Sequence, residues 1–275
     1  MVHFGRNVSF IAVVLACVAL KATSNPVGHV QVVGGTLAKQ GQFPHIAALL
    51  RREISGARTF FCGGSLIAPT WVLTTADCLR THNVGSTSVR TGELDFDQAT
   101  EYEQLVNAKR FVVHPDYVPT TALNNIALVE LSQPVVEIPG FVNSIKLATT
   151  RDVLYPGTEC TVAGWGSTSE GGATSKKLQF AYLPSMSDVE CGADWPERFD
   201  SPSQLCAGFS QGGISACGVD YGGPLTCGNN PVLQGVVSYN NGCGRPGLPS
   251  VYNRVSNYVD WINSNINNST LGSTV

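Results

Sequence analysis

Charged side chains are scarce in this sequence. Only 13% of its 275 residues are Asp, Glu, Lys or Arg, and the net charge is −3. It has no basic stripe, no internal repeat and no low-complexity tract. A weakly acidic chain of this kind gives no electrostatic reason to bind nucleic acid or an anionic membrane. Its hydrophobic residues, 43% of the total, can instead bury a substantial core in one large domain or two small ones.

Long apolar runs are absent beyond the N-terminal region, so we expect no membrane span. The run from Phe10 to Leu20 is shorter than the roughly 20 apolar residues that cross a bilayer. This run follows Arg6 and precedes the small residues of the segment 22–24, which is the order of a secretory signal peptide and its cleavage site. We therefore predict a signal peptide over residues 1–24, secretion and an extracellular location.

The cysteines form no C-x-x-C pair and have no histidines beside them, which argues against a zinc site. We predict no metal and no cofactor. One of the nine cysteines, Cys17, lies within the predicted signal peptide. The remaining even set is typical of disulfides in a secreted protein. About 105 pairings are possible for eight cysteines, so the residues alone do not select one.

Short β-like runs fill the body of the chain and are separated by turns rich in glycine and proline. This pattern favours a β-sandwich or a β-barrel. The expected strands are 45–50, 60–67, 71–75, 111–113, 126–131, 161–164, 232–239 and 250–253.

One helix is expected near the C-terminus. Ser256 can cap it, and a stripe of Val255, Val259, Ile262 and Ile266 recurs at helical spacing. We expect this stripe to pack on the body of the protein.

The segment 267–275 is expected to be a polar, frayed tail. Two overlapping sequons begin there, at Asn267 and Asn268, and make both asparagines candidate glycan acceptors.

Several sequence fragments occur in the order and at the spacing of one protein family. They are Val32-Val33-Gly34-Gly35, Cys62-Gly63-Gly64-Ser65-Leu66-Ile67, Trp71-Val72-Leu73-Thr74, Gly164-Trp165-Gly166, Gly222-Gly223-Pro224-Leu225, Gly235-Val236-Val237-Ser238, Val251-Tyr252 and Asp260-Trp261-Ile262. From Val32 to about Ile266 the chain resembles the chymotrypsin/trypsin-like serine proteases. The resemblance implies an all-β fold of two packed antiparallel β-barrels with a C-terminal helix and an active cleft between the barrels. It places the protease-homology domain at 32–266, after a propeptide-like segment at 25–31.

The resemblance also implies a disulfide pairing for the eight cysteines. The implied bridges are Cys62–Cys78, Cys160–Cys227, Cys191–Cys206 and Cys217–Cys243. Each bridge stabilises a fold by a few kcal/mol, so such a scaffold can persist without catalysis.

The three catalytic positions of that family carry other residues here. Asp77 stands at the histidine position, Asn125 at the aspartate position and Tyr221 at the serine position. In the family mechanism serine attacks the substrate carbonyl, histidine takes its proton, and aspartate orients the histidine. An aspartate does not shuttle protons near pH 7, an asparagine carries no charge, and a phenol extends too far. Val219 also replaces a glycine whose amide helps to form the oxyanion hole.

The specificity pocket implied by the resemblance is altered as well. Ser215 falls at its base and is followed by Ala216, which does not support a preference for Lys or Arg. Tyr239 and Asn240 replace the usual Trp-Gly of the substrate-binding strand, and Ser250 stands where glycine commonly opens the pocket. We expect a narrowed pocket whose mouth is filled by the ring at the nucleophile position.

Two further family features are uncertain in this chain. Active relatives pair a new N-terminus, here Val32, with the aspartate that matches Asp220. The preceding Gln31 does not suit a trypsin-like activator, so the segment 25–31 can remain attached. The acidic stretch Glu93–Glu103 lies where a trypsin-type calcium loop would be, but a solvated acidic face is our expectation.

The leading hypothesis is a secreted, monomeric, non-catalytic serine protease homolog that binds a protein partner. It would act as an inhibitor, decoy or cofactor of a protease or other hydrolase. Glucanase inhibitor proteins, which bind a host glycoside hydrolase, are one such kind. The candidate contact loops are 51–58, 81–88, 167–175 and 193–203.

Two alternatives remain open at this stage. The first is an active secreted serine-type endopeptidase with unorthodox residues, which would need a substitute base such as His82. The second is a carrier of a small molecule or carbohydrate in the remodelled cleft.

Overall fold

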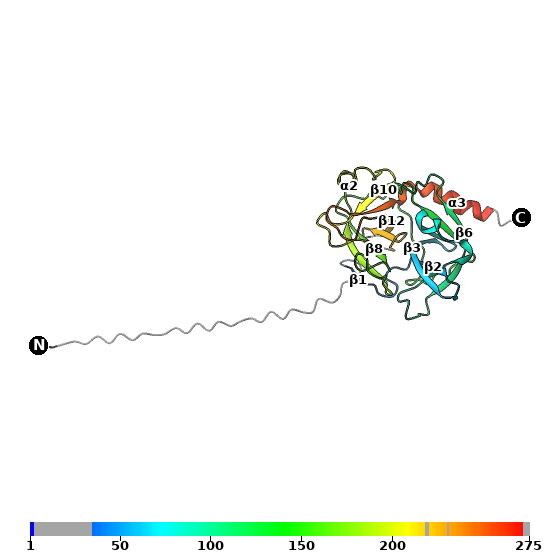
Figure 1. Ribbon diagram of the computed structural model, residues 1–275, viewed down its shortest axis with the longest axis horizontal. Helices are drawn as coiled ribbons and strands as arrows, with labels where there is room; N and C mark the ends of the chain where they lie inside the picture. The colour runs from blue at the N-terminus through cyan, green and yellow to red at the C-terminus, as the bar shows by residue number, and fades with distance from the viewer. Residues whose placement is uncertain (3–34, 218–219, 230, 272–275) are drawn as a thin grey trace.

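The structure is a computed structural model that describes residues 1–2, 35–217, 220–229 and 231–271 (Figure 1). Most of the predicted signal peptide, the segment 25–31, Val32 and Val219 lie outside the described residues, so the predictions made for them stand untested. The described part folds into two antiparallel β-sheets with short helices at their margins.

The first sheet closes into a six-stranded barrel. Its strands, in order around the barrel, are β2 (Ile46–Arg52), β3 (Arg58–Ala68), β4 (Trp71–Thr74), β7 (Ala127–Leu131), β6 (Gln104–Val113) and β5 (Thr87–Thr91). Strand β7 is buried on both of its faces. Ala127, Val129 and Leu131 point into the barrel, whereas Leu128 belongs to a second core beneath the C-terminal helix. Burial of both faces explains why four of its five residues are apolar. The fifth, Glu130, is buried and forms ion pairs with Lys109 and Arg110.

The second sheet has seven strands. Their order is β1 (Thr36–Leu37), β9 (Gln179–Pro184), β8 (Glu159–Gly164), β11 (Pro224–Cys227), β12 (Val232–Tyr239), β13 (Ser250–Arg254) and β10 (Gln204–Ala207). Its core includes Val162, Leu183, Leu225, Val237 and Tyr252, all less than 2% exposed. The expected all-β, trypsin-like fold is confirmed, with one sheet closed into a barrel and low helical content.

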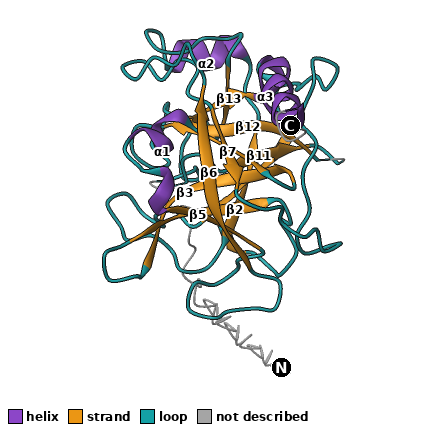
Figure 2. Ribbon diagram, turned by 90° about the vertical axis from the view of Figure 1, so that its right-hand side faces the viewer, coloured by secondary structure: helices purple, strands orange, loops and turns teal. Residues whose placement is uncertain are grey.

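Three α-helices are present among the described residues: α1 (Ala76–Arg80), α2 (Asp188–Asp194) and α3 (Val259–Leu271). Helices α2 and α3 lie at the same end of the molecule in both views (Figures 1 and 2). Ser187 caps α2 through a reciprocal capping box with Glu190.

Two expectations for the C-terminal helix are wrong. Ser256 does not cap it, because Val255–Asn257 forms a 3₁₀ turn and the helix begins at Val259. The turn carries Tyr258 into the core, where the side chain is 2% exposed. The helix also continues through Leu271 into the segment expected to be frayed, because extending a packed helix adds one hydrogen bond for each residue fixed. The predicted stripe does pack on the body, with Val255 and Ile262 fully buried.

Four disulfides join Cys62 to Cys78, Cys160 to Cys227, Cys191 to Cys206 and Cys217 to Cys243. This is the pairing implied by the family resemblance. The bridges are compatible with an extracellular location. Within the described residues, none of the helices is sufficiently long and apolar to cross a membrane.

Candidate functional site

Asp77 and Asn125 are brought together at the start of α1. Thr75 caps this helix, and Asp77 follows in its first turn. The backbone N–H of Asp77 donates to Oδ1 of the fully buried Asn125 at 2.9 Å. Asn125 donates in turn from Nδ2 to the Ser238 hydroxyl at 3.1 Å. The amide of Asn125 therefore ties the barrel to strand β12, a structural task that needs no charge.

The carboxylate of Asp77 takes no part in this link and is partly open to solvent. Its side chain is 41% exposed and lies 3.4 Å from the guanidinium of Arg80 one helical turn later. An exposed pair of this kind contributes little to stability. The carboxylate therefore occupies the histidine position without any described imidazole beside it.

Tyr221 is fixed at the junction of the two sheets. Its carbonyl accepts from the N–H of Gly63 on β3 at 2.9 Å, and the following residue, Gly222, donates to Val237 on β12 at 2.9 Å. Gly222 has φ +82°, and a Cβ there would clash with the carbonyl of Gly63. The glycine after Tyr221 is therefore required by both its backbone angle and the close approach of the barrel.

The Tyr221 ring is half-buried and packs against the cores of both the barrel and the second sheet. Its hydroxyl donates to Oδ1 of Asn240 at 3.0 Å. Nδ2 of Asn240 donates to the carbonyl of Ala216 at 2.9 Å. Tyr221, Asn240 and Ala216 thus form a clasp across the pocket predicted from the sequence. Burial and the nearby Asp220 charge raise the pKa of the Tyr221 phenol, which keeps it protonated at neutral pH.

The other pocket residues are also enclosed. Ser215 is 3% exposed and Ser250 is fully buried. Neither hydroxyl forms a hydrogen bond with a described group. Five cavities in the described part of the chain are lined by residues other than Tyr221, Asn240 and Ala216. The side chains of Ser215 and Ser250 are thus enclosed, and Asn240 bonds across to the Ala216 carbonyl.

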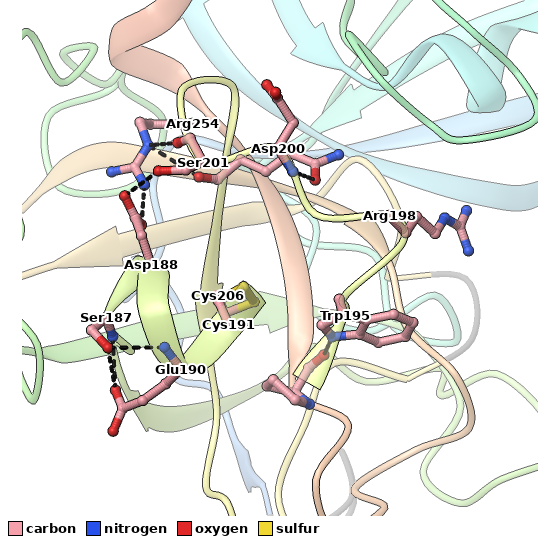
Figure 3. The surroundings of a disulfide bond; sticks show 12 residues. Ser187, Asp188, Glu190, Cys191, Trp195, Arg198, Asp200, Ser201, Cys206 and Arg254 are labelled. Atoms are coloured by element: carbon pink, nitrogen blue, oxygen red, sulfur yellow. Dashed lines mark hydrogen bonds and ion pairs between the residues drawn. A yellow bond between two sulfur atoms is a disulfide. The ribbon is translucent and has the colours of Figure 1, made fainter. Parts of the chain in front are cut away.

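Tyr239 ends strand β12, where the family resemblance places a substrate-binding segment, and its side chain is covered. Its ring is 5% exposed and packs edge-on against Trp195, with ring centroids 5.2 Å apart. The guanidinium of Arg198 lies 3.9 Å above the Tyr239 ring and its Nε donates to the Thr121 carbonyl at 3.1 Å. Figure 3 shows that Trp195 and Arg198 come from the segment that links α2 to β10. Both residues lie in the predicted contact loop 193–203, but their packing on Tyr239 was not predicted.

Two buried hydrogen bonds hold Asp220 beneath the pocket. The N–H groups of Gly166 and Cys217 donate to its two carboxylate oxygens at 2.8 and 2.9 Å. A Cβ on Gly164 or Gly166 would clash with this carboxyl group, which explains the glycines of the Gly-Trp-Gly motif. Burial raises the pKa of Asp220 to about 7, although the two backbone hydrogen bonds oppose the rise. Its predicted partner, Val32, lies outside the described residues.

Two of the described histidines pack against aromatic rings other than that of Tyr221. His82 stacks on Phe61 with ring centroids 3.8 Å apart. His114 packs against Trp261 at 5.0 Å, and His45 is only 7% exposed. Within the described part of the chain, none of the three forms a hydrogen bond with Tyr221 or Asp77.

We expected the acidic stretch Glu93–Glu103 to be a solvated face, but part of it is buried. Glu93 is 3% exposed because Arg90 reaches between two carboxylates, 2.7 Å from Glu93 and 3.7 Å from Glu103. Burial raises the pKa of Glu93, and the arginine opposes the rise. Among the described residues, no group of three or more His, Cys, Asp or Glu side chains is arranged to hold a metal ion.

Comparison with known proteins identifies the family. The family model described as trypsin matches residues 32–262. Human trypsin-3 is 38% identical over 237 residues, which cover 86% of this chain and 73% of that protein. The anionic trypsin of Bos taurus is 37% identical over 86% of this chain and 90% of its own length. Putative trypsin-6 of Homo sapiens is 36% identical over the same shares. The chain therefore belongs to the trypsin family.

Proposed function

We propose that this chain is a non-catalytic member of the trypsin family that acts outside the cell by binding a protein partner. The observation that carries the proposal is the clasp of Tyr221, Asn240 and Ala216, with its hydrogen bonds of 3.0 and 2.9 Å. A phenol that stays protonated is a poor nucleophile, and its ring occupies the space where a substrate side chain would enter.

The neighbouring positions support the same proposal. With Asp77 and Asn125 at these two positions, no described imidazole is there to take a proton from a nucleophile. The residues of a catalytic triad act as a unit, so loss of one member removes most of the rate enhancement that the unit provides. Arg198 covers the Tyr239 ring, so the adjoining strand is also closed to a peptide.

The contacts that hold the trypsin fold together are intact, which favours a binding function over a protein that has lost all function. The Asn125 amide, the Asp220 carboxylate and the four disulfides all hold the family frame in place. We propose that the partner is a protease or another hydrolase, and that the chain inhibits it, diverts it or serves as its cofactor. The predicted signal peptide and the disulfides support secretion.

The decisive experiment is a hydrolysis assay on the secreted protein, with casein and a broad peptide library as substrates. The matched variant restores the family residues through Asp77→His, Asn125→Asp, Tyr221→Ser and Val219→Gly. Aspartate can replace Asn125 without loss of its contacts, because a carboxylate accepts from both the Asp77 N–H and the Ser238 hydroxyl.

We expect hydrolysis only in the restored variant. Activity in the unmodified protein that disappears on Tyr221→Phe would refute the proposal and identify an active protease with unorthodox residues.

A further inference from the structure

A second concave site lies on the barrel, apart from the degenerate cleft. It is a hollow of about 320 Å³ between strands β2, β3 and β5 and the segment 174–176. Its cationic lining residues are Arg58, Arg90 and Lys176, and none of the described residues that line it is acidic. A cationic hollow is unexpected on a protein whose net charge is −3. Two of the four contact loops predicted from the sequence, 51–58 and 167–175, meet at this hollow.

The rim of the hollow carries an unfavourable pair of like charges. Arg52 on β2 and Arg58 on β3 are register partners in the antiparallel ladder, so their side chains leave the same face. Like charges directly opposite one another destabilise a sheet. Within the described residues, neither arginine has a carboxylate ion-pair partner, whereas the adjacent Arg51 is paired with Glu53. An anion bound at the rim would relieve this repulsion.

The floor of the hollow is apolar. Leu50, Phe60 and Phe96 line it, and the two phenylalanine rings lie 5.7 Å apart. Both rings pack on the fully buried Trp165, at 5.6 and 5.4 Å, so the floor is continuous with the protein core. Arg90 stands over Phe96 at 5.9 Å and is held there by Glu93. Arg90 is therefore partly neutralised. Arg58 donates from Nε to the Ser88 hydroxyl at 3.2 Å, but this neutral partner leaves its charge uncompensated. Arg58 and Lys176 in the lining, and Arg52 beside it as the register partner of Arg58, can therefore face an external anion.

The apolar floor and its cationic rim define the ligand chemistry. A polysulfated glycan gains affinity from a long cationic track, and the sequence contains no basic stripe. A short peptide with carboxylates on either side of one apolar side chain matches both parts of the hollow. Ile54, at the tip of the same hairpin, is fully exposed and adds an apolar contact beside the rim.

We infer that this hollow, with Arg52, Arg58 and Lys176 at its rim and Phe60 and Phe96 at its floor, binds an acidic segment of the protein partner. The inference rests on the proposed binding function and specifies the chemistry of the partner. The segment presents an aromatic or aliphatic side chain to the floor and its carboxylates to the three cations.

The test is fluorescence anisotropy with a labelled peptide of sequence Asp-Glu-Glu-Phe-Glu-Glu, titrated with the full secreted protein. The control peptide has amides in place of all carboxylates. The variants are Arg58→Gln, Lys176→Gln and the triple variant that adds Arg52→Gln. The matched control is Arg151→Gln, an exposed arginine that does not line the hollow.

We expect saturable binding of the acidic peptide alone, weaker by about 3- to 5-fold for each single variant and by roughly 30-fold for the triple variant. Raising the salt concentration should weaken peptide binding, because salt screens attraction between exposed charges and the Debye length is about 10 Å at 0.1 M. Arg151→Gln should leave it unchanged. Removing charge from Arg52 should also keep or raise the thermal midpoint, since a like-charge pair is relieved.

Three outcomes would overturn the inference: no saturable binding up to about 1 mM peptide, equal loss in Arg151→Gln, or tighter binding of a heparin hexasaccharide than of the peptide. None of these affects the hydrolysis assay, so failure of this inference and failure of the proposed function can be told apart.

Discussion

The ring of Tyr221 should be a measurable part of the stability of this protein. Complete removal of a buried aromatic side chain costs about 3–5 kcal/mol, and for a half-buried ring about 2 kcal/mol is reasonable. Loss of the hydrogen bond to Asn240 adds about 1 kcal/mol. We therefore expect Tyr221→Ala to lower the free energy of unfolding by about 3 kcal/mol, and Tyr221→Phe to lower it by about 1 kcal/mol.

The measurement is thermal and urea unfolding followed by circular dichroism. A loss of this size lowers the midpoint by about 6–12 °C in a domain of this length. The matched control is Tyr155→Ala, because the Tyr155 side chain is 70% exposed and its removal should change stability by no more than about 0.5 kcal/mol. The compound p-cresol, which has the shape of the missing side chain, should raise the midpoint of Tyr221→Ala but not that of Tyr155→Ala. Equal stability of the two alanine variants would refute the argument that the ring is wedged between two cores.

Three further outcomes are expected. Burial raises the pKa of Asp220 to about 7 and lowers the pKa of His45 to about 4. Protonated Asp220 therefore contributes to the free energy of unfolding at low pH, and this contribution is lost as the pH rises from about 4 to 7. Neutral His45 contributes at higher pH, and its contribution is lost as the pH falls from about 6.5 to 4. The variant His45→Phe lacks the opposing His45 contribution. Its free energy of unfolding in urea should therefore decline between about pH 4.5 and 7.5 more steeply than that of the parent protein. A steady rise would contradict the raised pKa of Asp220. Replacing both Cys191 and Cys206 by alanine opens a loop with a sequence separation of 15 and should cost about 3 kcal/mol in calorimetry; an unchanged midpoint would show that α2 is held without the bridge. Benzamidine should not bind at micromolar concentration by isothermal calorimetry, because side chains fill the pocket, and micromolar binding would show that the clasp opens.

Much of the fold could be predicted from sequence because strand pattern and burial agree. The runs around Trp71, Leu128 and Val237 are apolar and bounded by turn residues, and each forms a strand. Five strands were missed: β1, β5, β9, β10 and β11. Two of them, β9 (Gln179–Pro184) and β10 (Gln204–Ala207), show why. Both mix polar and apolar residues over a short stretch, and Gln204 and Gln179 are nonetheless fully buried. Local pattern does not reveal a polar side chain whose burial depends on distant partners.

The candidate site likewise has a part that the sequence predicts and a part that it does not. The residues at the positions that match the family's catalytic triad are recognisable because short motifs flank them, and the pocket residues follow from the same frame. The cover over Tyr239 is different, because Arg198 lies 41 residues earlier in the chain than the ring beneath it. The hollow with the cationic rim likewise joins β2, β3, β5 and the segment 174–176. Composition gives no signal for such groupings, since they exist only after the strands have paired.

The arrangement of strand edges bears on how this protein behaves when concentrated. The barrel is closed, and the seven-stranded sheet ends in β1, which has 2 residues, and in β10, which has 4. All four residues of β10 are buried, so its outer side is shielded by the chain around it. Intermolecular strand pairing needs a long open edge, and the described part of the molecule exposes none. We therefore expect the protein to resist fibril formation in concentrated solution, even though its apolar content is high.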